Sequence, residues 1–191
     1  MKTVGFAVCG SFCTFDAVFE QMQGLKDAGY DLLPIMSEIS YSSDTRFGSA
    51  EYWRERAEHI TEKRIIHTIP GAEPIGPQKL LDALIIAPCT GNTLAKLCTG
   101  VTDTAVTLAA KAHLRNERPL IIAVSTNDGL SNAAKNIGAL LNRKNIYFVP
   151  FGQDNAAGKP RSTVADFTLI KDTLQQAFEG RQLQPLITQA H

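Results

Sequence analysis

The sequence predicts a single α/β domain in which helices cover both faces of a parallel sheet of about six strands. Short runs of valine, isoleucine and leucine alternate with longer segments of helical period, and continuous apolar strands are typical of a sheet buried on both faces. The chain has 191 residues, enough for one sizeable core but short for two. It has no internal repeat and no linker. We therefore expect a three-layer, doubly wound, Rossmann-like fold over residues 1–191.

The first half of the chain is predicted to contribute three strands and two helices. The strands are the apolar runs at residues 3–9, 30–36 and 64–69. Pro34 places the second of them near a strand end or at a sheet edge. Residues 14–29 have apolar side chains at helical spacing and end at a glycine, which is typical of an amphipathic helix. A more polar helix is predicted at residues 50–63, and a turn with three prolines at residues 70–77.

The second half repeats the alternation. Strands are predicted at residues 83–87, 119–125 and 145–150. Helices are predicted at residues 92–99, 103–115, 129–143 and 163–179. The polar, glycine-containing residues 152–162 are predicted to be a mobile loop, and its basic part, residues 158–162, is a candidate lid. From about Gly180 the chain is predicted to form an extended tail, either disordered or wrapped on a neighbour.

The charge balance excludes several classes of partner. Lysine and arginine together number 19, as do aspartate and glutamate, so nothing predicts a global attraction to nucleic acid or to an anionic membrane. No apolar stretch approaches the roughly 20 residues that span a bilayer, and the apolar start of the chain is too short for a signal peptide. We therefore expect a cytoplasmic protein.

The cysteines are predicted to be free thiols. They are Cys9, Cys13, Cys89 and Cys98. A reducing compartment and apolar neighbours favour the reduced state. Their spacing lacks the histidine or second cysteine pair of a zinc site, so we predict neither a metal site nor a disulfide.

Small and polar residues follow five of the predicted strands, at the sheet edge where α/β proteins bind ligands. They are Gly10, Ser11 and Phe12 after the first strand, Ser37 after the second, His67 near the end of the third, Pro88, Thr90, Gly91, Asn92 and Thr93 after the fourth, and Ser125, Thr126 and Asn127 at the end of the fifth. Hydroxyls beside helix N-termini suit an anion such as phosphate, and we predict that Ser11 and Ser37 line one such site. The alternative is that each residue is only a helix N-cap.

The first of these loops is not a dinucleotide fingerprint. The segment GFAVCGSF, residues 5–12, lacks the G-x-G-x-x-G spacing. No acidic residue closes the second strand to hold a ribose; Ser37 stands there instead. A mononucleotide with one phosphate therefore fits the loops better than NAD.

The segment APCTGNT, residues 87–93, is the most informative of the strand ends. Pro88 has no N–H to continue the strand ladder, and Gly91 lets a ligand approach the backbone closely. One of the two threonines can cap the following helix. None of these roles requires an asparagine at position 92, so we predict that the Asn92 amide contacts a ligand.

His67 is the candidate proton acceptor among the strand-end residues. Histidine side chains in general titrate near neutrality, as a general base requires. A packing or capping role beside the proline-rich turn is the alternative.

The stretch IIAPCTGNTLAKLCTGVTDTAV, residues 85–106, resembles the flavoprotein superfamily of FMN-dependent cysteine decarboxylases and flavin prenyltransferases. Pro88, Asn92 and Thr93 match its Pro-x-Ser-Ala-Asn-Thr motif, with Thr90 in place of the serine and Gly91 in place of the alanine. Further matching positions are Lys96, Gly100, Asp103, Gly10, Ser11, Ser37 and His67. The resemblance implies FMN as the cofactor, a catalytic role for Asn92 against a substrate carboxylate, and a homo-oligomer with FMN where subunits meet.

Other segments resemble one branch of this superfamily, a subunit of the dipicolinate-forming synthase of spore-forming bacteria. They are AEPIGP, AAKAHLRN, STNDGL and KNIYFVPFGQD. This resemblance implies an oxidoreductase subunit that converts a dihydrodipicolinate-type intermediate to dipicolinate in the mother cell, with an A subunit that binds NAD(P). A decarboxylase, a flavin prenyltransferase and a non-catalytic stabilising subunit are the alternatives. Ser125-Thr126-Asn127 stands where the decarboxylases have Pro-x-Met-Asn, which disfavours decarboxylation.

Overall fold

The computed structural model describes residues 1–188, in which a seven-stranded sheet is the middle of three layers. The strands are β1 (Thr3–Val8), β2 (Asp31–Met36), β3 (Ala83–Cys89), β4 (Leu120–Thr126), β5 (Ile146–Phe148), β6 (Phe151–Asn155) and β7 (Lys159–Ala165). Their order is β2-β1-β3-β4-β7-β6, and β5 also pairs with β4. The first five strands are parallel, whereas β7 is antiparallel to both β4 and β6.

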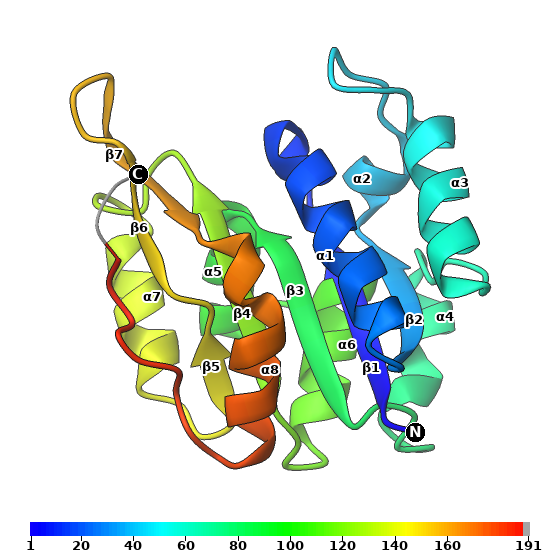
Figure 1. Cartoon of the computed structure of the whole chain (residues 1–191). Helices are drawn as coiled ribbons and strands as arrows, with labels where there is room; N and C mark the ends of the chain where they lie inside the picture. The colour runs from blue at the N-terminus through cyan, green and yellow to red at the C-terminus, as the bar shows by residue number, and fades with distance from the viewer. Residues whose placement is uncertain (189–191) are drawn as a thin grey trace.

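Helices cover both faces of the sheet (Figure 1). They are α1 (Phe15–Asp27), α2 (Glu38–Ser42), α3 (Ala50–Thr61), α4 (Ile69–Ala72), α5 (Gly91–Thr99), α6 (Ala105–Leu114), α7 (Ala134–Leu141) and α8 (Ile170–Phe178). Helix α1 packs with α3 and α8 on one face, and α6 packs with α4 and α5 on the other, where α5 also contacts α7. The predicted doubly wound α/β fold is confirmed.

The core follows from the apolar runs of the sequence. All seven residues of β3 are buried, because the strand lies between β1 and β4 and under helices on both faces. The parallel register places Phe6, Ile85 and Ile121 side by side across three strands, all fully buried. Each such side chain contributes about 1.5–3 kcal/mol of transfer free energy when it leaves water.

Three predictions about single elements are wrong, and the helix predicted at residues 163–179 begins only at Ile170, after β7 has ended at Ala165. The first concerns residues 64–69, which form no strand beyond one parallel bridge between Ile35 and Ile66. Ile66 donates to the Pro34 carbonyl and accepts from Met36, but Pro34 has no N–H with which to extend the ladder. The chain then enters α4, with Pro70 in its first turn.

The second concerns residues 152–162, which are not an unstructured loop. They belong to the hairpin of β6 and β7, so the sheet is mixed rather than wholly parallel. The hairpin turns at Asn155, whose side-chain oxygen accepts from the Gly158 N–H at 2.8 Å. Strand β7 adds hydrogen bonds to the end of β4, at Ser125 and Thr126. The prediction failed because both strands are largely polar and lack a continuous apolar run. Strand β6 forms the edge of the sheet, and β7 lies between β6 and β4.

The third concerns Pro88, which does not end its strand. Strand β3 continues to Cys89, with a register shift against β4 between Ile86 and Cys89. An irregularity of this kind accommodates a residue that cannot donate to the ladder.

The tail after α8 lies along its own sheet as far as the structure describes it. The Gln182 amide donates to the Phe148 carbonyl and accepts from the Phe148 N–H, at 2.6 and 2.8 Å. Farther along, Thr188 and Leu186 pair with the backbone of Phe151. These contacts cover an exposed sheet edge. The last part of the predicted tail, residues 189–191, lies outside the described residues.

Within residues 1–188, no helix is long and apolar enough to cross a bilayer, and no group of three or more histidine, cysteine or acidic side chains is arranged to hold a metal. All four cysteines are free thiols.

Candidate functional site

A cleft of about 830 Å³ lies at the carboxyl edge of the parallel strands, where α/β proteins bind ligands. Its floor, which we call the cleft floor, consists of the residues after β1, β3 and β4 and the start of α5. Two further segments, which we call the arms, also line it: the turn at residues 43–49 and the β6–β7 hairpin. Figure 1 shows both arms projecting beyond the sheet edge, on opposite sides.

The cleft brings together most of the predicted site residues. They are Gly10, Ser11, Phe12, Thr90, Gly91, Asn92, Ser125, Thr126 and Asn127. The Ser11 and Ser125 hydroxyls lie 2.7 Å apart and share a hydrogen bond across the ends of β1 and β4. The parallel topology therefore gathers residues that lie more than a hundred positions apart.

A smaller cleft of about 400 Å³ adjoins the first. Ser37 and Thr93 line it, and it shares Gly10, Thr90 and Asn92 with the larger cleft. Ser11 and Ser37 therefore lie in neighbouring clefts, and their common anion site stays a prediction.

The start of α5 explains the sequence between positions 90 and 93. The Thr90 hydroxyl caps the helix by accepting from the Thr93 N–H at 3.2 Å. At position 91 a Cβ would lie 2.7 Å from both Thr126 Oγ1 and Asp128 Oδ1, so any residue larger than glycine would displace these two side chains. The Asn92 side chain is exposed between the two clefts and forms no hydrogen bond with the described residues. Asn92 is therefore available to a ligand rather than acting as the cap.

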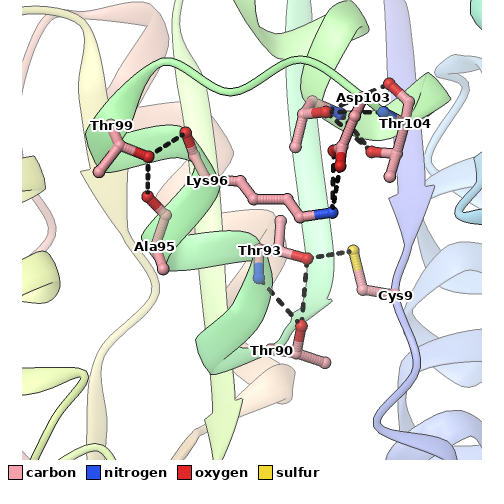
Figure 2. A network of polar contacts seen from close by, with 9 residues as sticks. Cys9, Thr90, Thr93, Ala95, Lys96, Thr99, Asp103 and Thr104 are labelled. Atoms are coloured by element: carbon pink, nitrogen blue, oxygen red, sulfur yellow. Dashed lines mark hydrogen bonds and ion pairs between the residues drawn. The ribbon is translucent and has the colours of Figure 1, made fainter.

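A polar network joins α5 to β1 and to the start of α6 (Figure 2). The Thr93 hydroxyl donates to Cys9 Sγ at 3.3 Å, and Lys96 pairs with Asp103 at 2.8 Å. Burial raises the pKa of Cys9 to about 11, although the hydrogen bond from Thr93 opposes the shift. Burial also raises the pKa of Cys89. Both thiols stay neutral at physiological pH, which makes them poor nucleophiles.

Two predicted site residues line neither cleft. Pro88 is buried inside β3. His67 is half-buried and stacks on Tyr41, with ring centroids 3.6 Å apart and planes 8° apart. Its role as a base stays a prediction, and within one chain the geometry does not place it beside the clefts.

The structure adds charged residues that were not among the predicted site residues. Asp128 lies on the cleft floor against Gly91 and accepts from the Thr126 hydroxyl at 2.5 Å. Arg46 comes from the first arm, and the Lys159–Asp154 ion pair comes from the second. Asp128 directly follows Asn127 at the end of the fifth predicted strand, so its place in the sequence could have identified it as a site residue. No local pattern marks Arg46, whose turn reaches the cleft only in the folded chain.

Residues 1–174 match the model of a family described as Flavoprotein. The chain belongs to the flavoprotein family. Among members of this family, it is 42% identical over 188 residues to the B subunit of dipicolinate synthase of Bacillus subtilis (strain 168), covering 98% of this chain and 94% of that protein. The crystal structure of the corresponding B subunit from Bacillus halodurans C superimposes with a TM-score of 0.92 at 40% identity, covering 100% and 97% of the two chains.

A more distant flavoprotein shares the fold. The structure of the FMN-dependent cysteine decarboxylase SpaF superimposes with a TM-score of 0.68 at 22% identity, covering 93% of this chain and 97% of that one. At this identity the likeness concerns the fold alone. The resemblance of the sequence to the flavoprotein superfamily is confirmed.

The residues at the cleft floor fit the flavin that the family implies. The first N–H groups of α5 lack helical partners, and the nearby hydroxyls of Ser11, Thr90 and Ser125 offer donors for a phosphate and a ribityl chain. The cradle beside Gly91 would be filled by any side chain at that position. A volume of about 830 Å³ lies in the range of cofactor sites.

Proposed function

We propose that this chain is the flavin-binding subunit of a dipicolinate synthase, in which a dihydrodipicolinate-type dicarboxylate is oxidised to dipicolinate during sporulation. The observation that carries the proposal is the 42% identity to the Bacillus subtilis protein over 98% of the chain. The match covers nearly the whole chain, so it includes the segments that line both clefts as well as the core.

We assign FMN to this site as the cofactor. Ser11, Ser37 and the first N–H groups of α5 would hold its phosphate, since hydroxyls and unpaired helix N–H groups are phosphate donors. Ser125, Thr126 and Asn127 line the same cleft and would contact the rest of the molecule. When bound, a flavin supplies a two-electron acceptor.

Asn92 is the residue that we expect to orient the substrate. Its amide is exposed where the two clefts meet. A neutral amide can donate to a substrate carboxylate without the desolvation cost of a buried charge.

Aromatisation of the ring removes a hydride and a proton, so a base is also required. His67 is the candidate by its chemistry. Because His67 lines neither cleft of its own chain, it can act only at a site completed by another subunit. We therefore include in the proposal a homo-oligomer, together with an A subunit that binds NAD(P).

Reconstitution with the A subunit tests this function. The two subunits would be co-purified, the complex would be scanned for flavin absorbance, and dipicolinate output would be measured with each subunit left out in turn. We expect flavin with this chain and full output only from the complex. Full dipicolinate output from the A subunit alone would contradict the proposal. Full output from a flavin-free complex would contradict the flavin role and indicate that this chain only stabilises the A subunit.

A further inference from the structure

We propose that Arg46 binds one carboxylate of the substrate in the larger cleft and so selects dicarboxylates over monocarboxylates. This inference rests on the proposed function, which supplies the substrate class. The arginine lies on the first arm, at the tip of the turn formed by residues 43–49.

The charges that line the cleft single out this arginine. They are Arg46, Asp128, Asp154 and Lys159. Lys159 pairs with Asp154 at 2.8 Å, and Asp128 accepts from a neighbouring threonine hydroxyl on the cleft floor. Arg46 forms no ion pair or hydrogen bond with any of residues 1–188; its guanidinium carbon lies 4.8 Å from the centroid of the Phe47 ring. Among the described residues it is thus the cation of the cleft that has no anionic partner.

Contacts within the turn and below it fix the backbone that carries Arg46. Thr45 and Gly48 exchange two backbone hydrogen bonds of 3.1 Å, and the Asp44 carboxylate accepts from the Ala50 N–H at 2.8 Å. Gly48 lies directly on the buried indole of Trp53, because a Cβ there would come within 2.6 Å of Trp53 Nε1. The aromatic core therefore supports the turn. Because the backbone of the turn is already ordered, it loses less conformational entropy when a ligand binds.

Guanidinium chemistry suits a carboxylate on a planar ring. The planar fork of N–H donors can hold both carboxylate oxygens at once. Phe47 and Phe12 line the same cleft and offer apolar surface to an aromatic or dihydro-aromatic ring. With Asn92 on the cleft floor holding the second carboxylate, the two groups would bind the two ends of one small molecule.

The cofactor phosphate is the competing ligand for this guanidinium. The donors that suit a phosphate lie on the cleft floor and in the smaller cleft, where Ser37, Thr93 and Lys96 gather. Arg46 lines the larger cleft but not the smaller one. The arrangement leaves the phosphate donors to the cofactor and Arg46, on the first arm, to a substrate carboxylate, and the two ligands can be titrated separately.

The test compares wild type with Arg46→Gln and Arg46→Lys by calorimetric titration. FMN is titrated into the untreated chain. Dipicolinate and the monocarboxylate picolinate are titrated into the FMN-treated chain, in metal-free buffer because dipicolinate chelates divalent cations. Arg64→Gln is the matched control, since Arg64 is exposed and lines neither cleft. Because Arg46 is also exposed, its variants should fold, and their thermal midpoints are measured alongside.

We expect Arg46→Gln to weaken dipicolinate binding at least tenfold and to leave picolinate and FMN binding nearly unchanged. Arg46→Lys, which keeps the positive charge, should recover part of the lost dipicolinate affinity. Unchanged dipicolinate affinity in Arg46→Gln, or a loss of FMN affinity instead, would overturn the assignment of Arg46. Dipicolinate binding that depends on Arg46 in a chain that takes up no FMN would support the assignment and contradict the flavin role. No dipicolinate binding by wild type would overturn the inference.

Discussion

The cleft floor and the two arms enclose the same cleft but are built in opposite ways. On the floor, side chains are tied to one another, as in the Ser11–Ser125 bond of 2.7 Å, and position 91 has no room for a Cβ. The arms carry exposed charges on short turns, represented by Arg46 and Lys159. The difference implies a division of labour in which the buried body, meaning the sheet with its covering helices and the cleft floor, sets geometry and the arms supply charge. Substitutions in the two regions should therefore affect different measurements.

The largest expected effect concerns His113 in the buried body. Nε2 of this fully buried ring donates to the Pro119 carbonyl at 2.9 Å, and Nδ1 has no partner among the described residues. Burial lowers the pKa of His113 to about 4, below its unfolded value of about 6.5. The unfolded chain therefore binds the proton first, and stability is lost as pH falls from about 6.5 towards 4, by about 3 kcal/mol.

Urea unfolding at several pH values measures this effect. The wild-type free energy of unfolding should drop steeply below pH 6.5, and His113→Gln should flatten the slope over that range. An identical slope in the variant would show that acid destabilises the protein through other groups. Arg46→Gln should retain the wild-type slope, because the arm lies outside the core.

Gly91→Ala should give the next largest effect. Its Cβ would lie 2.7 Å from two oxygens, and overpacking of this kind costs about 1–3 kcal/mol. We expect a lower free energy of unfolding and a loss of flavin binding together. Gly138→Ala is the control, because position 138 lies in α7 with no atom within 4 Å of the new Cβ; there alanine should stabilise by about 0.5–1 kcal/mol. If Gly91→Ala left the free energy of unfolding unchanged, the side chains of Thr126 and Asp128 would have to move aside without cost.

Asn92→Asp tests a residue of the cleft floor that we assign to the substrate rather than to the cofactor. The side chain is exposed at the start of α5, where a carboxylate is tolerated by the helix dipole, so the thermal midpoint should not fall. A carboxylate at position 92 would repel the dicarboxylate substrate. The lost polar contact should raise the activation free energy of dipicolinate formation by about 1–3 kcal/mol, and dipicolinate output should fall accordingly. Full activity at unchanged stability would remove Asn92 from the site.

The smallest effect on stability is expected in the second arm. Lys159→Ala breaks an exposed ion pair with Asp154, and surface pairs contribute little. The hydrogen bond to Asp154 raises the pKa of Lys159, so the lysine stays charged through the usual pH range. The thermal midpoint should stay within error of wild type. A clear drop would show that the hairpin is part of the body rather than an arm.

The buried body could be predicted from the sequence far better than the arms. Continuous apolar runs mark β1, β3 and β4, and their common carboxyl edge predicts that Ser11, Asn92 and Ser125 come together. The polar strands could not be predicted in this way. Strand β7 pairs with β4, and β6 pairs with β7, but neither has an apolar run. Residues 64–69, in contrast, have a strand-like composition beside a proline that cannot pair. Arg46 reaches the cleft through the packing of Gly48 on Trp53, a contact that no local pattern encodes.

A crossed calorimetric titration tests the division of labour most directly. FMN and dipicolinate would each be titrated into wild type, the floor variant Ser11→Val and the arm variant Arg46→Gln. We predict that Ser11→Val weakens FMN binding at least tenfold with little effect on dipicolinate, and that Arg46→Gln does the reverse. If both variants weaken the same ligand, or neither weakens any, the cleft floor and the arms do not have the separate roles that we assign to them.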